Sequence, residues 1–110
     1  MTTTVQKQVL LNARALIADP ARWTRSYLAR NAAGHPVHWC DPSATTWCAM
    51  GAIYRSAYEL VGCKKEATRI GKEVARRLAP IWFCRSLTTL NDARGHAVVL
   101  ARFDRALAAA

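Results

Sequence analysis

Cys48 could act as a catalytic nucleophile, because a thiolate is strongly nucleophilic. A reactive thiol needs a lowered pKa, from a helix N-terminus or a neighbouring cation, and a base within reach. His96 could be that base, and Asn91 with Asp92 could orient it, which would make the chain a small Cys/His-dependent enzyme. A helix that begins near Pro42 would instead place Cys48 almost two turns from the helix end, where the N–H groups are already bonded.

A packing role for Cys48 is the interpretation that we favour. In a helix, Ala44, Gly51 and Ala52 would lie on the same side as Cys48, and these small side chains would let another element approach closely. The same strip could be the contact of a self-associating structural protein, which we keep as a further alternative. Because a chain of 110 residues leaves little material for a substrate cleft, we expect no catalytic residues and no cofactor.

Three potential zinc ligands stand close together in the pattern H-x-x-H-x-C, at His35, His38 and Cys40. Zinc prefers four nitrogen or sulfur ligands in a tetrahedron, and Cys48 or Cys63 could be the fourth. The spacing matches no common structural zinc module, and loop histidines near a proline are more often simply solvated. We therefore expect no bound metal.

Basic residues recur along one predicted helix at positions 65, 69, 72 and 76, which is the spacing of a single helical face. With the two residues that flank the face, the set is Lys64, Lys65, Arg69, Lys72, Arg76 and Arg77. A solvated face is the usual explanation for such a pattern, but Glu66 and Glu73 are too few to neutralise this one. The pattern predicts a non-enzymatic basic module that binds nucleic acid or an acidic protein surface.

The charge of the whole chain favours the same partners. Sixteen Lys and Arg residues against seven Asp and Glu give a net charge of +9, which attracts polyanions. No apolar run is long enough for a signal-peptide core or a membrane span, and the four cysteines are irregularly spaced. We expect a cytoplasmic protein with reduced thiols and no contact with a membrane.

Asn91 and Asp92 also have a structural interpretation, because short Asn and Asp side chains readily bond nearby backbone groups. We predict that residues 91–95 form a turn, that Gly95 takes a positive φ there, and that Asp92 accepts N–H groups at the start of the final helix. The aromatic side chains could form a base-stacking platform, but in so small a domain we expect them in the core and at its edge.

The elements that must position these residues follow from the hydrophobic pattern, which predicts a mainly α fold with about four helices around one core. We predict one domain over residues 1–110, with helices over 4–18, 42–61, 64–79 and from about 96 onward. Between the first two, the alternating segments RWTRSYLA and VHWC flank the turn NAAGHP and predict a small β-hairpin. Asp41-Pro42 predicts the start of the second helix. Periodicity does not assign residues 81–90, for which we expect a short helix or an extended crossing.

Two motifs resemble a family of small proteins of unknown function from actinobacteria, other bacteria and phages. The first is a W-T-x-x-x-x-A-R stretch that leads to WCAMGA, and the second is LND before VLARFDRAL. The resemblance covers nearly the whole chain and implies a shared fold, without an activity to carry over. Leu90 stands where the family often has an aromatic residue, and His96 where a Thr that could cap the last helix is common.

Overall fold

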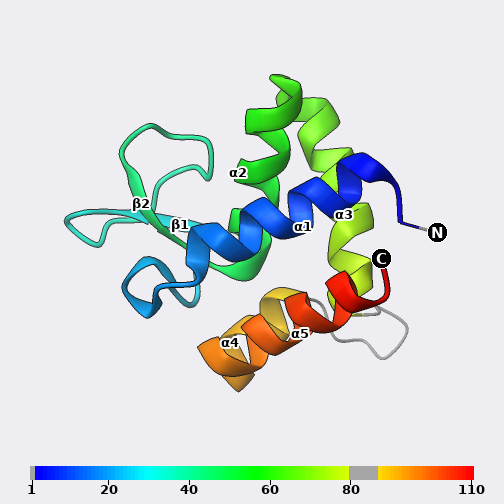
Figure 1. Cartoon of the computed structure of the whole chain (residues 1–110). Coiled ribbons are helices and arrows are strands. Elements are labelled where there is room, and N and C mark those ends of the chain that lie inside the picture. Colours follow the sequence, from blue (N-terminus) through cyan, green and yellow to red (C-terminus); the bar gives the residue numbers. More distant parts are fainter. Residues whose placement is uncertain (1, 80–86) are drawn as a thin grey trace.

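A computed structural model describes residues 2–79 and 87–110, and Figure 1 shows how the elements are arranged. In these ranges the fold is mainly α, with five α-helices and a two-stranded antiparallel hairpin between the first two. The predicted fold class is therefore confirmed, with one helix more than the four expected. The elements are α1 Thr4–Ile17, the 3-10 helix η1 Pro20–Arg22, β1 Ala29–Asn31, β2 Ala44–Trp47, α2 Ala49–Val61, α3 Lys64–Leu78, α4 Leu87–Arg94 and α5 His96–Ala108.

The first and third predicted helices lie where the hydrophobic pattern placed them, and the second ends where predicted. α1 begins with a capping box, in which the side chains of Thr3 and Gln6 each accept the other residue's backbone N–H. α2 ends at Gly62, which takes a φ of 71° as the C-cap. α3 buries one stripe of apolar residues, which includes Val74, against the rest of the protein.

The prediction that the second helix begins near Pro42 is wrong, because α2 begins at Ala49. The carboxylate of Asp41 accepts the backbone N–H and the hydroxyl of Ser43, at 2.8 and 2.7 Å, and these bonds close a turn. The following residues include two threonines, which favour extended structure, and they pair with β1 as strand β2. Residues 42–48 thus form a turn, a strand and the cap of the helix.

The predicted hairpin is confirmed, but its second strand lies later in the chain than the VHWC segment. Ala29 pairs with Trp47 and Arg30 with Thr46, and a bulge shifts the register before Asn31. Ala29 and Trp47 are both buried, so this end of the hairpin packs on the core. The region around VHWC contributes only an isolated bridge next to β1 and a turn.

The predicted turn over residues 91–95 is also wrong in part, because residues 91–94 belong to α4. Gly95 takes a φ of 94°, as predicted, and it separates α4 from α5. Of the segment left unassigned by periodicity, residues 87–90 are helical. Residues 81–86 lie outside the described ranges.

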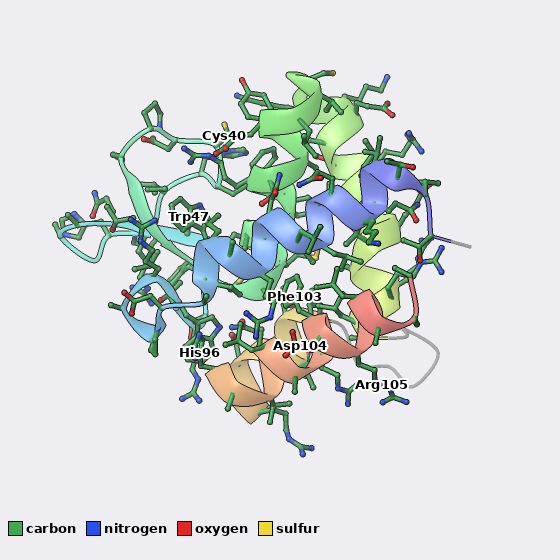
Figure 2. The ribbon with its side chains drawn as sticks, viewed as in Figure 1. Cys40, Trp47, His96, Phe103, Asp104 and Arg105 are labelled. Carbon is green, nitrogen blue, oxygen red and sulfur yellow. The ribbon has the colours of Figure 1, made fainter. Side chains whose placement is uncertain are left out.

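The core lies between α1, α2, α3 and α5, and all four contribute fully buried side chains. Leu10, Ile53, Val74 and Phe103 are examples, and Figure 2 shows Phe103 on the side of α5 toward α1. Beside it, Arg14 of α1 and Asp104 of α5 form an ion pair. Within the described ranges, every helix is too short or too polar to cross a lipid bilayer.

Aromatic side chains close the edge of this core next to the hairpin. Trp39 and Trp47 are buried. The ring of Trp39 packs against those of Tyr54 and Tyr58, with centroids 5.4 and 5.9 Å apart. The expected core role is confirmed for these four residues, whereas Tyr27 is 49% exposed.

Candidate functional site

Cys48 is the N-cap of α2, not a residue in the middle of the helix. Its backbone is extended, and its Sγ accepts the N–H of Gly51 at 3.3 Å. Its own N–H donates to the carbonyl of Leu28 at 3.2 Å, which ties the start of α2 to the segment before β1. Our reason for excluding a reactive thiol, that Cys48 lies far inside a helix, is therefore wrong, because β2 occupies the preceding residues.

Burial nevertheless gives the Cys48 thiol the properties of a packing residue. Only 2% of the residue is exposed. This burial raises the pKa of the thiol, against the opposing hydrogen bonds from the backbone of Gly51 and Met50, and the charge of Asp92 adds to the rise. At neutral pH the thiol keeps its proton, which is the opposite of what a nucleophile requires.

Gly51 lies where the backbone of Leu28 closely approaches α2. A Cβ built on Gly51 would lie 1.9 Å from the carbonyl oxygen of Leu28, far inside van der Waals contact. The absence of a side chain therefore lets the backbone before β1 reach α2. The predicted close approach of another element is confirmed at Gly51. Ala44 lies in β2 and is not part of that helical face.

Asn91 connects α4 to two other parts of the chain, and it is fully buried. Its Oδ1 accepts the indole N–H of Trp23 at 2.6 Å and the backbone N–H of Ala49 at 2.9 Å. Its Nδ2 donates to the carbonyl of Thr24 at 3.0 Å. Asn91 thus bonds backbone groups, but the prediction that these groups are nearby in the chain is wrong, because they are distant in sequence and include the first turn of α2.

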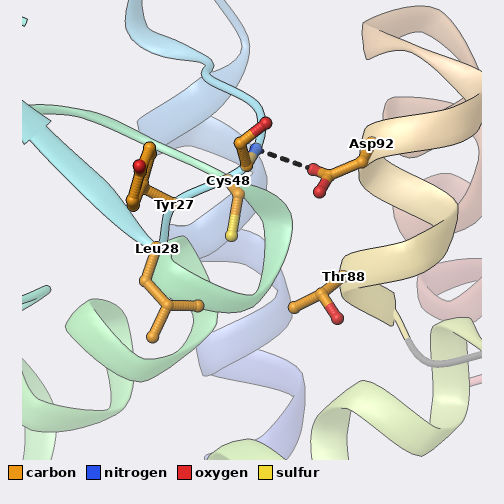
Figure 3. A pocket seen from close by; sticks show the side chains of 6 residues that line it. Tyr27, Leu28, Cys48, Thr88 and Asp92 are labelled. Carbon is orange, nitrogen blue, oxygen red and sulfur yellow. Dashed lines mark hydrogen bonds between the residues drawn. The ribbon is translucent and has the colours of Figure 1, made fainter. Parts of the chain in front are cut away.

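Asp92 also bonds a group that is distant in sequence. Its Oδ1 accepts the N–H of Ser26 at 3.0 Å, the contact drawn in Figure 3. Ser26 has a φ of 72°, which is unusual for a residue with a side chain. The prediction that Asp92 caps the final helix is wrong, because α5 begins at His96 with Gly95 as its N-cap and has no side-chain cap.

His96 stands at the start of α5, and its hydrogen-bond and ring contacts within the described ranges are with Ile17 and Trp23, not with Cys48. Its Nε2 lies 2.7 Å from the carbonyl oxygen of Ile17, at the end of α1, and its ring centroid is 5.5 Å from that of Trp23 (Figure 2). The cavity next to Cys48 includes Asp92 in its lining but not His96. The fold thus brings Cys48 and Asp92 to one cavity, and Asn91 is hydrogen-bonded to Asp92. His96 instead contacts Ile17 and Trp23.

The segment that contains His35, His38 and Cys40 is held by contacts among its own residues. Nδ1 of His38 accepts the N–H of Cys40 at 3.1 Å, and the His38 ring lies 4.6 Å from that of Trp39. In the part of the chain that the structure describes, no three His, Cys, Asp or Glu side chains are placed to share a metal ion.

The basic residues on α3 form one solvent-exposed face, opposite the buried stripe of that helix. We call Lys65, Arg69, Lys72 and Arg76 the α3 face. Arg69 forms ion pairs with both Glu66 and Glu73. Among the described residues, Lys65, Lys72 and Arg76 form none. Next to the face, Gln6 donates to Glu73 at 3.0 Å.

The chain matches a known protein family over nearly its whole length. Residues 1–109 match DUF6197, a family of unknown function. The chain belongs to this family. The resemblance found from the two sequence motifs is thereby confirmed, and no curated protein and no solved structure matches the chain. In this DUF6197 member, the motif WCAMGA has a structural meaning, because its Cys caps α2 and its Gly admits the backbone of Leu28.

The burial of Cys48 predicts a slow reaction with alkylating reagents. Iodoacetamide at neutral pH should modify Cys48 at least about tenfold more slowly than the exposed Cys63, because burial lowers both access and thiolate content. Peptide mapping by mass spectrometry at successive times measures both rates in one sample. In denaturant the two rates should converge. Equal rates in the native protein would contradict the packing role.

Proposed function

We propose that this protein binds nucleic acid through the α3 face and acts without catalysis. The observation that carries the proposal is the arrangement of that face, with four cations exposed along one side of a single helix and three of them free of ion pairs within the described ranges. Lys64 and Arg77, both exposed, extend it on either flank. The proposal includes that the protein acts in the cytoplasm.

The dimensions of the α3 face suit a phosphate backbone. From residue 65 to residue 76 the helix rises by about 16 Å, and successive cations are separated by about 5 to 6 Å. Duplex DNA carries one negative charge per roughly 1.7 Å of its axis, so several side chains of the α3 face can contact phosphates together. The pairs of Arg69 with Glu66 and Glu73 are exposed, and exposed ion pairs contribute little free energy, so Arg69 can exchange them for a phosphate.

An acidic protein surface is the other partner considered, and the α3 face favours it less. Stable protein interfaces contain an apolar centre, often with aromatic anchors. The four positions of the α3 face are Lys or Arg, without an aromatic or large aliphatic side chain among them.

Recognition of nucleic acid by the α3 face would depend only weakly on base sequence, because Lys and Arg directed at phosphates do not read base edges.

A salt series on a short DNA duplex tests this proposal. Wild type should bind at low salt, and the logarithm of its affinity should fall with the logarithm of the salt concentration with a slope of about −3, for three to four phosphate contacts. The variant Lys65→Glu with Lys72→Glu should flatten that slope and weaken binding by at least about tenfold. Fluorescence anisotropy measures both quantities.

The control variant changes the same charge elsewhere. Arg22→Glu with Arg94→Glu replaces two exposed cations on η1 and α4, so the net charge is the same as in the test variant. Its affinity should stay closer to that of wild type. If both variants lose affinity equally, only net charge matters and the α3 face is not the site. No binding by wild type at low salt would refute the proposal and leave an acidic protein as the partner to test.

A further inference from the structure

A small cavity of about 160 Å³ lies between α4 and the segment that precedes β1. Figure 3 shows it from close by, with the thiol of Cys48 at its centre and Thr88 and Asp92 of α4 on one side. The residues that line it are Ser26, Tyr27, Leu28, Cys48, Thr88 and Asp92. None of them belongs to the α3 face, so the cavity is independent of the proposed nucleic-acid contact.

Among the described residues that line the cavity, Asp92 is the one that carries a charge. Its Oδ1 accepts two hydrogen bonds, from the N–H of Ser26 at 3.0 Å and from Nδ2 of Asn91 at 3.1 Å. Within the described ranges, its Oδ2 accepts none. A carboxylate oxygen at the edge of a cavity therefore keeps its capacity to accept a hydrogen bond from a ligand.

Two N–H groups at the start of α2 and the nearby guanidinium of Arg30 are already engaged, which argues against an anionic ligand. The start of α2 would attract an anion through its N–H groups, but Ala49 donates to Asn91 and Gly51 donates to the sulfur of Cys48. Arg30 stacks 4.5 Å above the ring of Tyr27, and its guanidinium donates to oxygen atoms of the chain itself. In the part of the lining that the structure describes, the cavity thus presents a negative charge without a cationic side chain.

The size of the cavity limits the ligand. About 150 Å³ is enough for a molecule as large as benzene, whereas pockets for drug-sized molecules measure about 300 to 1,000 Å³. We propose that the cavity binds a small organic cation, an ammonium group with a short apolar tail. The ammonium donates to Oδ2 of Asp92, and the tail lies against Leu28, Cys48 and the ring of Tyr27.

The test is an NMR titration of the full chain with n-butylammonium chloride, n-butanol and sodium butyrate, each against sodium chloride of the same concentration. Butylammonium should shift the amide signals of residues that line the cavity, with a dissociation constant of about 1 to 10 mM, as expected for so few atoms. Butanol should bind at least about fivefold more weakly, and butyrate should produce no saturable shift, because the carboxylate of Asp92 repels it.

Two variants identify the group that binds. Asp92→Asn keeps an acceptor for the N–H of Ser26, so the fold should persist, but it should weaken butylammonium binding at least about fivefold because the charge is lost. Asp104→Asn removes the same charge at a site paired with Arg14 and should bind as wild type does. A wild type without saturable shifts up to about 50 mM, equal shifts with butyrate, or unchanged binding by Asp92→Asn would overturn the proposal.

Discussion

Replacing Asn91 with alanine should lower the free energy of unfolding by about 3 to 5 kcal/mol, since three backbone or side-chain groups lose their partner at once. The indole N–H of Trp23 and the N–H of Ala49 would lose an acceptor, and the carbonyl of Thr24 would lose a donor. Asn91 is fully buried, so water cannot take its place without a cavity large enough to hold it. Each buried unsatisfied group costs about 1 to 3 kcal/mol.

Urea unfolding followed by circular dichroism measures this loss, and Asn12→Ala is the matched control. Asn12 accepts a hydrogen bond from Gln8 on the surface of α1, at 2.8 Å. Its loss should change stability by no more than about 0.5 kcal/mol, as is usual for surface substitutions. Equal stability of Asn91→Ala and Asn12→Ala would mean that the Asn91 bonds do not hold α4 to the start of α2.

Replacing Gly51 with alanine should cost at least about 3 kcal/mol, because the new methyl group meets backbone atoms that cannot turn away as a side chain would. The added Cβ would lie 1.9 Å from the oxygen and 2.8 Å from the carbon of the Leu28 carbonyl. Relief requires the segment before β1 to move away from α2. That movement also stretches the hydrogen bond from Cys48 to Leu28.

Gly62→Ala separates this steric effect from the conformational freedom of glycine. Gly62 takes a φ of 71°, and a Cβ added there meets nothing within 4 Å. The cost should be only about 1 kcal/mol, from the left-handed backbone. Thermal unfolding of both variants gives the comparison. A Gly51→Ala variant as stable as Gly62→Ala would contradict the close approach of the Leu28 backbone to α2.

The sequence determined the elements whose residues interact mainly with their own neighbours in the chain. The apolar stripes of α1, α3 and α5 repeat every three to four residues, so the helices and their buried faces follow from periodicity. Gly62 and Gly95 end or separate helices because a positive φ is favoured by glycine, which is a local property. The basic face on α3 is likewise a consequence of spacing along one helix.

Only the tertiary structure decided where α2 begins and what Cys48, Asn91, Asp92 and His96 contact. Pairing of β2 with β1 overrides the local helix-start signal of Asp41 and Pro42, since strand pairing depends on residues distant in sequence. Asn91 and Asp92 bond groups that lie 42 to 68 residues away. Side-chain polarity shows that such residues need partners when buried, but the partners are fixed by which elements pack together. No property of residues 91 to 96 in isolation specifies Trp23, Ser26 or the first turn of α2.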